Sequence, residues 1–318
     1  MKRIVTLLLA AGLVLGAAAG SQAADIKAKG NWTFTWQLGD NNLFEKNGDK
    51  FTAKQRLRTQ IDVIASESLK GVLFLEMGDQ NWGSSKDGAS LGTDGKIVKV
   101  RYSYVDWVIP QTDAKVRMGL QNFSLPGFIS NNPILGGGSA DGAGITISGQ
   151  FTENVGASLF WLRAENDNTD GYHGNPSSNA MDFVGLTVPM TFDGVKVTPW
   201  AMYGALGRDS FTNGNGDEGA GVVNGLLPTG VDGSWLKGSD LDRHGNAWWV
   251  GVASELTYFD PFRFALDAAY GSADMGSIGG FDVERSGWFA SILGEYKMDY
   301  FTPGILFWYA SGDDSNWA

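Results

Sequence analysis

The sequence contains no cysteine and only two histidines among its 318 residues. Without cysteine, a disulfide scaffold, a thiolate-ligated zinc or iron–sulfur site and thiol catalysis are excluded. Charged residues are also sparse, at 19%, and acids outnumber bases 35 to 24, so the formal net charge is −11. Nucleic-acid binding requires stripes of Lys and Arg, so this balance predicts that nucleic acid is not a partner.

Long apolar runs are confined to the N-terminus. Lys2 and Arg3 precede a short apolar run, and small residues follow it up to Ala23. This order is typical of a secretory signal peptide, and the apolar run is short for a membrane-spanning helix. We expect residues 1–23 to be the signal peptide and residues 24–318 to be the mature domain.

The rest of the sequence alternates with a period of two. Between residues 26 and 38, apolar and aromatic residues occupy the even positions and polar residues occupy most of the odd ones. A strand puts such residues on opposite faces, whereas a helix would scatter them. The pattern predicts 13 strands and no helix: 26–38, 51–63, 71–79, 97–108, 114–121, 143–151, 155–164, 180–190, 195–206, 246–258, 263–272, 286–298 and 304–311.

Alternation also fits a soluble β-sandwich, but three features favour a transmembrane antiparallel β-barrel. The strands are long enough for tilted membrane strands, which need about 9–11 residues. Aromatic residues crowd the strand ends, as at a lipid headgroup boundary. The connections also alternate between short ones and long ones, the long ones being 39–50, 80–96, 122–142, 165–179, 207–245 and 273–285.

The strand count is odd, whereas single-chain bacterial barrels have even numbers of strands. We therefore interpret the sequence as C-terminally incomplete, with three strands missing if the full barrel has 16.

Three segments carry a family resemblance: IKAKGNWTFTWQ near the start, FTAKQRLRTQIDVIASESLKGVLFLEMGD, and WYASGDD near the end. Together with the signal peptide, they resemble the homotrimeric outer-membrane general porins of sulfate-reducing bacteria. The resemblance implies a 16-stranded homotrimeric diffusion channel in the outer membrane of a Gram-negative bacterium. Its partners would be copies of itself, outer-membrane lipid and lipopolysaccharide, and small hydrophilic solutes and ions.

The polar strand faces carry the candidate pore residues, because such faces would line the lumen and tune selectivity. A basic ladder is predicted on one wall, comprising Lys54, Arg56, Arg58, Lys99, Arg101, Lys115 and Arg117. Inward acids are expected elsewhere, at Asp62, Glu76, Glu255, Asp267 and Glu295. Such an arrangement would create a field across the pore. The alternative is an ordinary solvated strand face.

The connection 122–142 is unusually apolar for an exposed loop. We expect it to fold inward and constrict the channel, with Phe123, Phe128, Ile134 and Asp141 as its key residues. Asp141 would be its only acid, so no strong cation selectivity is expected. A surface loop or a trimer contact is the alternative.

Asn166, Asn168 and Asp170 match the front half of a calcium-binding loop, but the bidentate Glu of that motif is absent. Turn formation explains these residues equally well. We therefore predict no cofactor and no metal, with structural calcium as the alternative.

The predicted function is passive diffusion of small hydrophilic solutes and ions, without enzymatic activity. A solute-specific channel is the first alternative, and an outer-membrane hydrolase using His173 or His244 is the second.

Overall fold

The computed structural model describes residues 24–40, 49–93, 95, 98–129, 134–135, 140–166, 180–208, 210, 242–278 and 280–311. The predicted signal peptide lies outside these residues. All regular structure in the described part is antiparallel β-strand in one sheet, which confirms the predicted all-β antiparallel class. Within the same residues, no helix has the length and hydrophobicity needed to cross a membrane.

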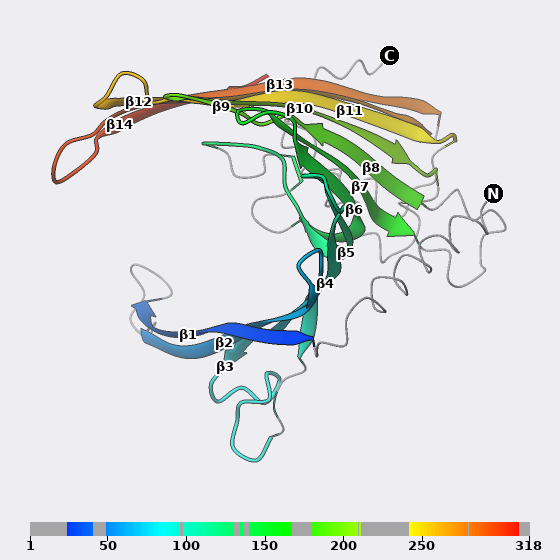
Figure 1. Ribbon diagram of the computed structural model, residues 1–318. Coiled ribbons are helices and arrows are strands. Elements are labelled where there is room, and N and C mark those ends of the chain that lie inside the picture. Colours follow the sequence, from blue (N-terminus) through cyan, green and yellow to red (C-terminus); the bar gives the residue numbers. More distant parts are fainter. Residues whose placement is uncertain are drawn as a thin grey trace. The chain divides into compact units, whose positions relative to one another are not determined.

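The described residues contain fourteen strands that follow one another in chain order; Figure 1 labels them. Their bounds are β1 Asp25–Asp40, β2 Asp49–Ser66, β3 Leu69–Asn81, β4 Lys99–Val108, β5 Lys115–Phe123, β6 Ala140–Gln150, β7 Gly156–Asn166, β8 Ala180–Thr187, β9 Met190–Phe192, β10 Val195–Leu206, β11 Gly245–Leu256, β12 Phe262–Ile278, β13 Phe281–Tyr296 and β14 Gly304–Ala310.

The sheet order follows the chain order except at β9, which pairs with β10 beside β8 and also forms one bridge from Met190 to Val155. The sequence pattern treats 180–190 as one strand, but the structure ends β8 at Thr187 and begins the short β9 at Met190. Pro189 lies in the break, and proline lacks the N–H that a central ladder needs. The 13 predicted strands therefore all exist, and β9 is the additional one.

One predicted long connection is wrong. Residues 273–285 lie mostly within β12 and β13, which are joined through residues 279 and 280 alone. The pairing register shifts between Asp274 and Ser277, and Gly276 within the shift has a positive φ of 74°. This irregularity interrupts the period-two pattern, which explains why the sequence alone ended the strand too early.

The chain divides into two compact units. The first comprises residues 1–110 and 119–121, and the second comprises residues 111–118 and 122–318. Each unit has strands with two distinct faces. In the first unit, the apolar positions of β1 are exposed on one face, with Trp32 at 64% and Trp36 at 60%.

A register shift in β4 changes the predicted faces of its aromatic residues. Phe74 pairs with Tyr102 and Leu75 pairs with Val100, so Arg101 is an extra residue between them. Tyr102 therefore joins the face of Phe74 and Glu76, instead of the apolar face predicted by simple alternation. A bulge of this kind leaves little trace in the sequence.

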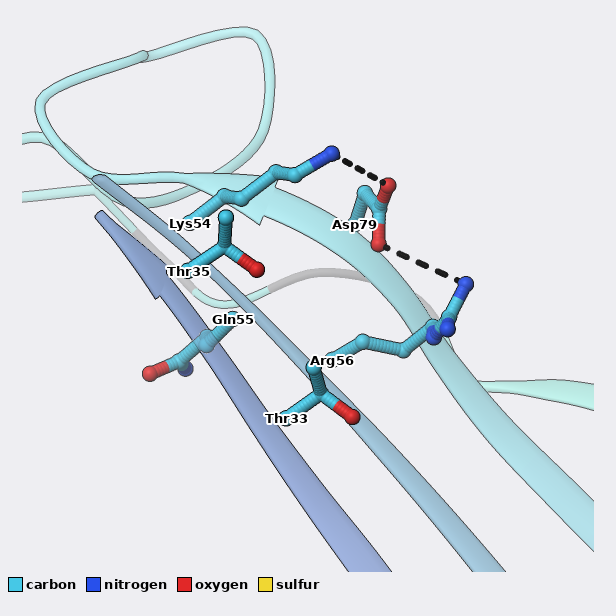
Figure 2. A pocket seen from close by; sticks show the side chains of 6 residues that line it. All are labelled: Thr33, Thr35, Lys54, Gln55, Arg56 and Asp79. Atoms are coloured by element: carbon cyan, nitrogen blue, oxygen red, sulfur yellow. Dashed lines mark hydrogen bonds and ion pairs between the residues drawn. The ribbon is translucent and has the colours of Figure 1, made fainter. Parts of the chain in front are cut away.

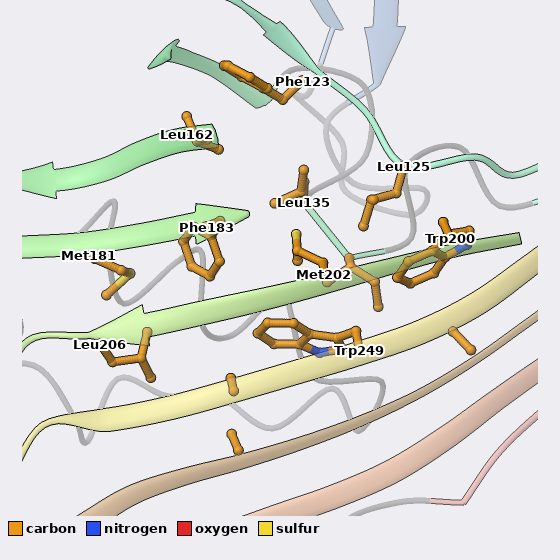
Figure 3. Close-up of a cluster of buried hydrophobic side chains, with 14 of the residues drawn as sticks. Phe123, Leu125, Leu135, Leu162, Met181, Phe183, Trp200, Met202, Leu206 and Trp249 are labelled. Atoms are coloured by element: carbon orange, nitrogen blue, oxygen red, sulfur yellow. The ribbon is translucent and has the colours of Figure 1, made fainter. Parts of the chain in front are cut away.

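The second unit has one face that is buried and one that is exposed. Neighbouring residues show the contrast most clearly, because Trp249 is 2% exposed and Trp248 is 42% exposed. The buried face carries a cluster of apolar side chains from β7 to β13, with Trp249, Phe183 and Met202 at its centre (Figure 3). The same cluster includes residues of the β5–β6 connection, so that connection is packed on this face.

Candidate functional site

The predicted basic residues of the first unit lie on the polar face of its sheet, where acids join them. Arg58 pairs in register with Glu76 of β3, and its Nε donates to Glu76 Oε2 at 2.5 Å. Arg101 Nη1 donates to the same oxygen at 3.4 Å. One carboxylate therefore holds two guanidinium groups from different strands.

A second shared carboxylate lies further along β3. Asp79 Oδ2 lies 3.3 Å from Lys54 Nζ, and Asp79 Oδ1 lies 3.8 Å from Arg56 Nη1. Thr33 and Thr35 of β1 complete a recess of about 80 Å³ around these groups (Figure 2). Sequence reasoning missed Asp79 because the pairing register shifts opposite Arg56, which blurs the alternation of β3.

The expected separation of acids from the basic ladder is wrong for this unit. Glu76 contacts two of the ladder residues, and Lys99 is its register partner in β4. Asp62 lies on the same polar face of β2 as Arg58 and accepts a hydrogen bond from Gln60 at 2.6 Å. Cross-strand neighbours of opposite charge stabilise sheets, so the strand register itself brings these acids to the cations.

Aromatic rings brace one of these clusters. The rings of Phe74 and Tyr102 stack with centroids 5.1 Å apart, and the guanidinium of Arg101 lies 5.5 Å from the Tyr102 ring centroid. Cation–π contact and ring stacking both restrict side-chain rotation. Arg101 is therefore positioned by Tyr102 as well as by Glu76.

The polar face of the first unit is net positive although the whole chain is acidic. Among the strand side chains that the structure describes, eight basic and five acidic ones lie on it by register and contact: Lys27, Lys29, Lys54, Arg56, Arg58, Lys70, Lys99 and Arg101, with Asp25, Asp62, Glu76, Asp79 and Asp106. The remaining predicted ladder residues, Lys115 and Arg117, belong to the second unit. They share their face of β5 with the buried Phe123.

A separate charge network lies on the buried face of the second unit, the face that also carries the apolar cluster. Glu255 accepts from Lys196 at 2.9 Å and from Arg263 at 2.6 Å. Arg263 also donates to Glu295 at 2.6 Å. Both acids could be predicted from the sequence but their basic partners could not, since Lys196 and Arg263 lie close to strand starts, where the face is hard to assign.

Asp267 anchors the β5–β6 connection to the face of β12. Its Oδ1 accepts the backbone N–H of Phe128 at 2.9 Å, and its Oδ2 accepts that of Ile129 at 2.7 Å. Asp267 is only 3% exposed. A buried carboxylate needs such donors, and hydrogen bonds to a charged group are stronger than neutral ones. The predicted site residues Phe128 and Asp267 are thus brought together.

Apolar contacts continue this attachment. Phe123 and Leu125 are each 3% exposed and Ile134 is 2% exposed, all within the cluster that contains Trp249. Figure 3 shows Leu125 and Leu135 among side chains of β8, β10 and β11. Burial of one such side chain contributes about 1.5–3 kcal/mol. The described part of the connection is therefore held by packing as well as by Asp267.

The predicted role of Asp141 in this connection is wrong. β6 already begins at Ala140, and Asp141 accepts a hydrogen bond from Asn122 at 3.1 Å. It shares its strand face with the exposed Ile147, whereas a Cβ on Gly142 would meet Phe123 on the opposite face. Asp141 thus points away from the side on which the connection packs.

The calcium candidates are only partly described. Asn166 ends β7, while Asn168 and Asp170 lie outside the described residues. Across the described ranges, no group of three or more His, Asp or Glu side chains is arranged to hold a metal ion. His244 Nδ1 accepts the backbone N–H of Arg208 at 3.3 Å, and His173 is outside the described residues.

No protein-family model matches the sequence, and no curated protein matches it. The structure is similar to solved outer-membrane porins and channels. It matches Salmonella typhi OmpF in complex with daunomycin at 14% identity and TM-score 0.47, covering 91% of this chain and 80% of that one. It matches Acinetobacter baumannii OccAB3 at 12% identity and TM-score 0.49, covering 91% and 68%. The outer membrane channel DcaP of the same organism matches at 14% identity and TM-score 0.39, covering 92% of each chain.

Proposed function

We propose that the chain is an outer-membrane β-barrel porin that lets small hydrophilic solutes and ions diffuse across the membrane. One observation carries this proposal: long antiparallel strands expose large apolar and aromatic side chains on one face and gather charged side chains on the other. Trp32 and Trp36 in the first unit, and Trp248 and Val250 in the second, lie on the exposed apolar face.

A water-soluble protein rarely exposes an apolar surface of this extent, but a membrane strand requires one on its lipid side. The backbone of such a strand must be paired by its neighbours, as it is along the sheet described above. The exposed apolar faces are therefore evidence for contact with lipid, and the charged faces are evidence for an aqueous path. The signal peptide predicted for residues 1–23 supports export to the outer membrane.

The β5–β6 connection is the proposed constriction. It is anchored by Asp267 and by Phe123, Leu125 and Ile134 on the same side of the strands as the charge network of Glu255 and Arg263. A loop held there would narrow an aqueous path, whereas one packed on the lipid side would not.

Liposome swelling tests the general-diffusion function. Vesicles containing the full chain are expected to swell in isotonic sugars at rates that fall smoothly with sugar size. A solute-specific channel is the second candidate, supported by the Phe74–Tyr102 stack on the polar face. It would admit one sugar far faster than others of equal size, with saturation. Swelling no faster than protein-free vesicles would refute both.

Three further properties belong to this proposal. The chain forms a homotrimer, it contacts lipid and lipopolysaccharide through its apolar face, and it is not a hydrolase. Size-exclusion chromatography with light scattering in detergent tests the trimer. Ester and peptide substrates incubated with the protein test catalysis, and loss of turnover on replacing His244 would overturn the last statement.

A further inference from the structure

The recess between β1, β2 and β3 in the first unit combines two cations with one carboxylate. Lys54 and Arg56 both face Asp79, so the three side chains together carry one positive charge (Figure 2). The side chain of Gln55 turns to the other face, where its Nε2 donates to Gln80 at 2.8 Å. Besides Gln55, the lining of the recess consists of two cations, two hydroxyls and a single acid.

The ion pairs within the recess are long enough for a solute anion to compete with Asp79 for the two cations. The Arg56–Asp79 separation of 3.8 Å exceeds hydrogen-bond length. A guanidinium has five N–H donors and an ammonium has three, more than one carboxylate can accept. The side chains of Lys54, Arg56 and Asp79 are 41%, 36% and 46% exposed, so a solute on this face reaches them directly.

Two hydroxyl groups line the β1 side of the recess. Thr33 Oγ1 donates to Asn31 at 2.9 Å, which fixes its orientation, and Thr35 lies two residues further along the same face. A hydroxyl has one O–H donor. Thr33 gives its donor to Asn31, so Thr35 is the residue whose hydroxyl can donate to an oxyanion in the recess. The described side chains of this face, those of the recess included, are eight basic and five acidic, and such an excess of positive charge raises the local concentration of anions.

We propose that this recess is a transient binding station for small oxyanions, such as inorganic phosphate or the carboxylate of an organic acid. The inference rests on the proposed channel function and names a class of solute for it. Lys54, Arg56 and the Thr35 hydroxyl hold the anion. Asp79 competes with it and keeps binding weak, as conduction requires that a bound ion also leaves.

Planar-bilayer recording of the full chain tests the station with inorganic phosphate as the probe. Added phosphate is expected to reduce the chloride current of the wild type in a saturable manner. Asp79→Asn removes the competing charge, so the half-blocking concentration should fall about fivefold, the scale of an exposed charge pair. Arg56→Gln should abolish the saturable block by phosphate. Lys54→Gln provides the same test if Arg56→Gln yields no channels.

Lys27→Gln is the matched control. Lys27 lies on the same face and pairs with Asp25 at 3.4 Å, outside the recess. Phosphate should block the chloride current of this variant at the same half-blocking concentration as in the wild type. The binding station would be overturned if phosphate blocked the Asp79→Asn channel no more strongly than the wild type. It would also be overturned if Arg56→Gln and Lys54→Gln had the same half-blocking concentration as Lys27→Gln. Absence of any wild-type current would instead overturn the proposed channel.

Discussion

The carboxylate of Asp267 accepts the backbone N–H of Ile129 at 2.7 Å, although the two residues are 138 positions apart. Asp267 lies within β12, and Ile129 lies in the connection between β5 and β6. The same carboxylate also accepts the N–H of Phe128. A single buried side chain thus attaches the β5–β6 connection to a distant strand. The proposed constriction can therefore be tested by replacing that one residue.

Asp267→Ala should loosen the β5–β6 connection. It leaves two backbone N–H groups without their acceptor, at a cost of about 1–3 kcal/mol each if they stay buried. We expect faster amide exchange at Phe128 and Ile129, measured by NMR in detergent, and larger or noisier single-channel conductance. Asp267→Asn keeps one acceptor oxygen and should lie between this variant and the wild type. Unchanged exchange in Asp267→Ala would contradict the anchoring role.

Trp249 and Trp248 offer a comparison of the two faces of one strand. Trp249→Ala should lower the free energy of unfolding by about 3–5 kcal/mol, because it empties a packed cluster. Trp248→Ala should cost clearly less, because its side chain lies on the exposed face. Denaturant titration in lipid vesicles measures both. Equal losses for the two variants would mean that the faces are assigned wrongly.

Gly251 has no room for a side chain. A Cβ there would come within 2.3 Å of the Trp200 ring and 2.8 Å of the Ala268 carbonyl oxygen. Gly251→Ala should therefore lower the unfolding midpoint, since ring and backbone would both have to move. Gly294→Ala is the control, because its nearest neighbour would be Phe264 at 3.6 Å. Thermal unfolding in detergent compares them, and a Gly251→Ala protein as stable as Gly294→Ala would refute this packing.

Asp242 should make stability depend on pH in the acid range. The N–H of Ser277 donates to its Oδ1 at 2.7 Å, and this hydrogen bond lowers the pKa of Asp242 below its ordinary value of 3.8. A depressed pKa means that the stabilisation is complete above the ordinary value and is lost as pH falls through the lowered one.

Asp242→Asn should therefore reduce the unfolding midpoint at pH 6 more than at pH 3. Denaturant titration at the two pH values gives the comparison. A loss that is equal at both pH values would show that ionisation of Asp242 contributes nothing.

The strands and their two faces could be predicted from the sequence because alternation is a local property of each strand. Trp248 and Trp249 are adjacent, and their opposite exposure follows from a period of two. Prediction from the sequence was wrong where the period of two is broken locally. The shift around Gly276 hid the long β12–β13 hairpin, and the extra residue Arg101 reversed the predicted face of Tyr102.

The site was less predictable because its contacts are long-range. The ladder residue Arg58 could be placed on a polar face, but nothing local indicates that Glu76 and Arg101 share its contact. Asp267 could be identified as an inward acid, yet its partners lie about 140 residues earlier in the chain. Such partners depend on strand register and on how a connection folds, which single-sequence patterns do not encode.

Ion conductance of the purified full chain in a planar lipid bilayer tests the channel proposal most directly. The account predicts stepwise insertion events, with current proportional to voltage and closing in three equal levels if the unit is a trimer. It also predicts that Asp267→Ala changes the size of each step while Trp248→Ala does not. A protein that folds to the same β-sheet content in detergent but gives no current in the bilayer would contradict the central claim.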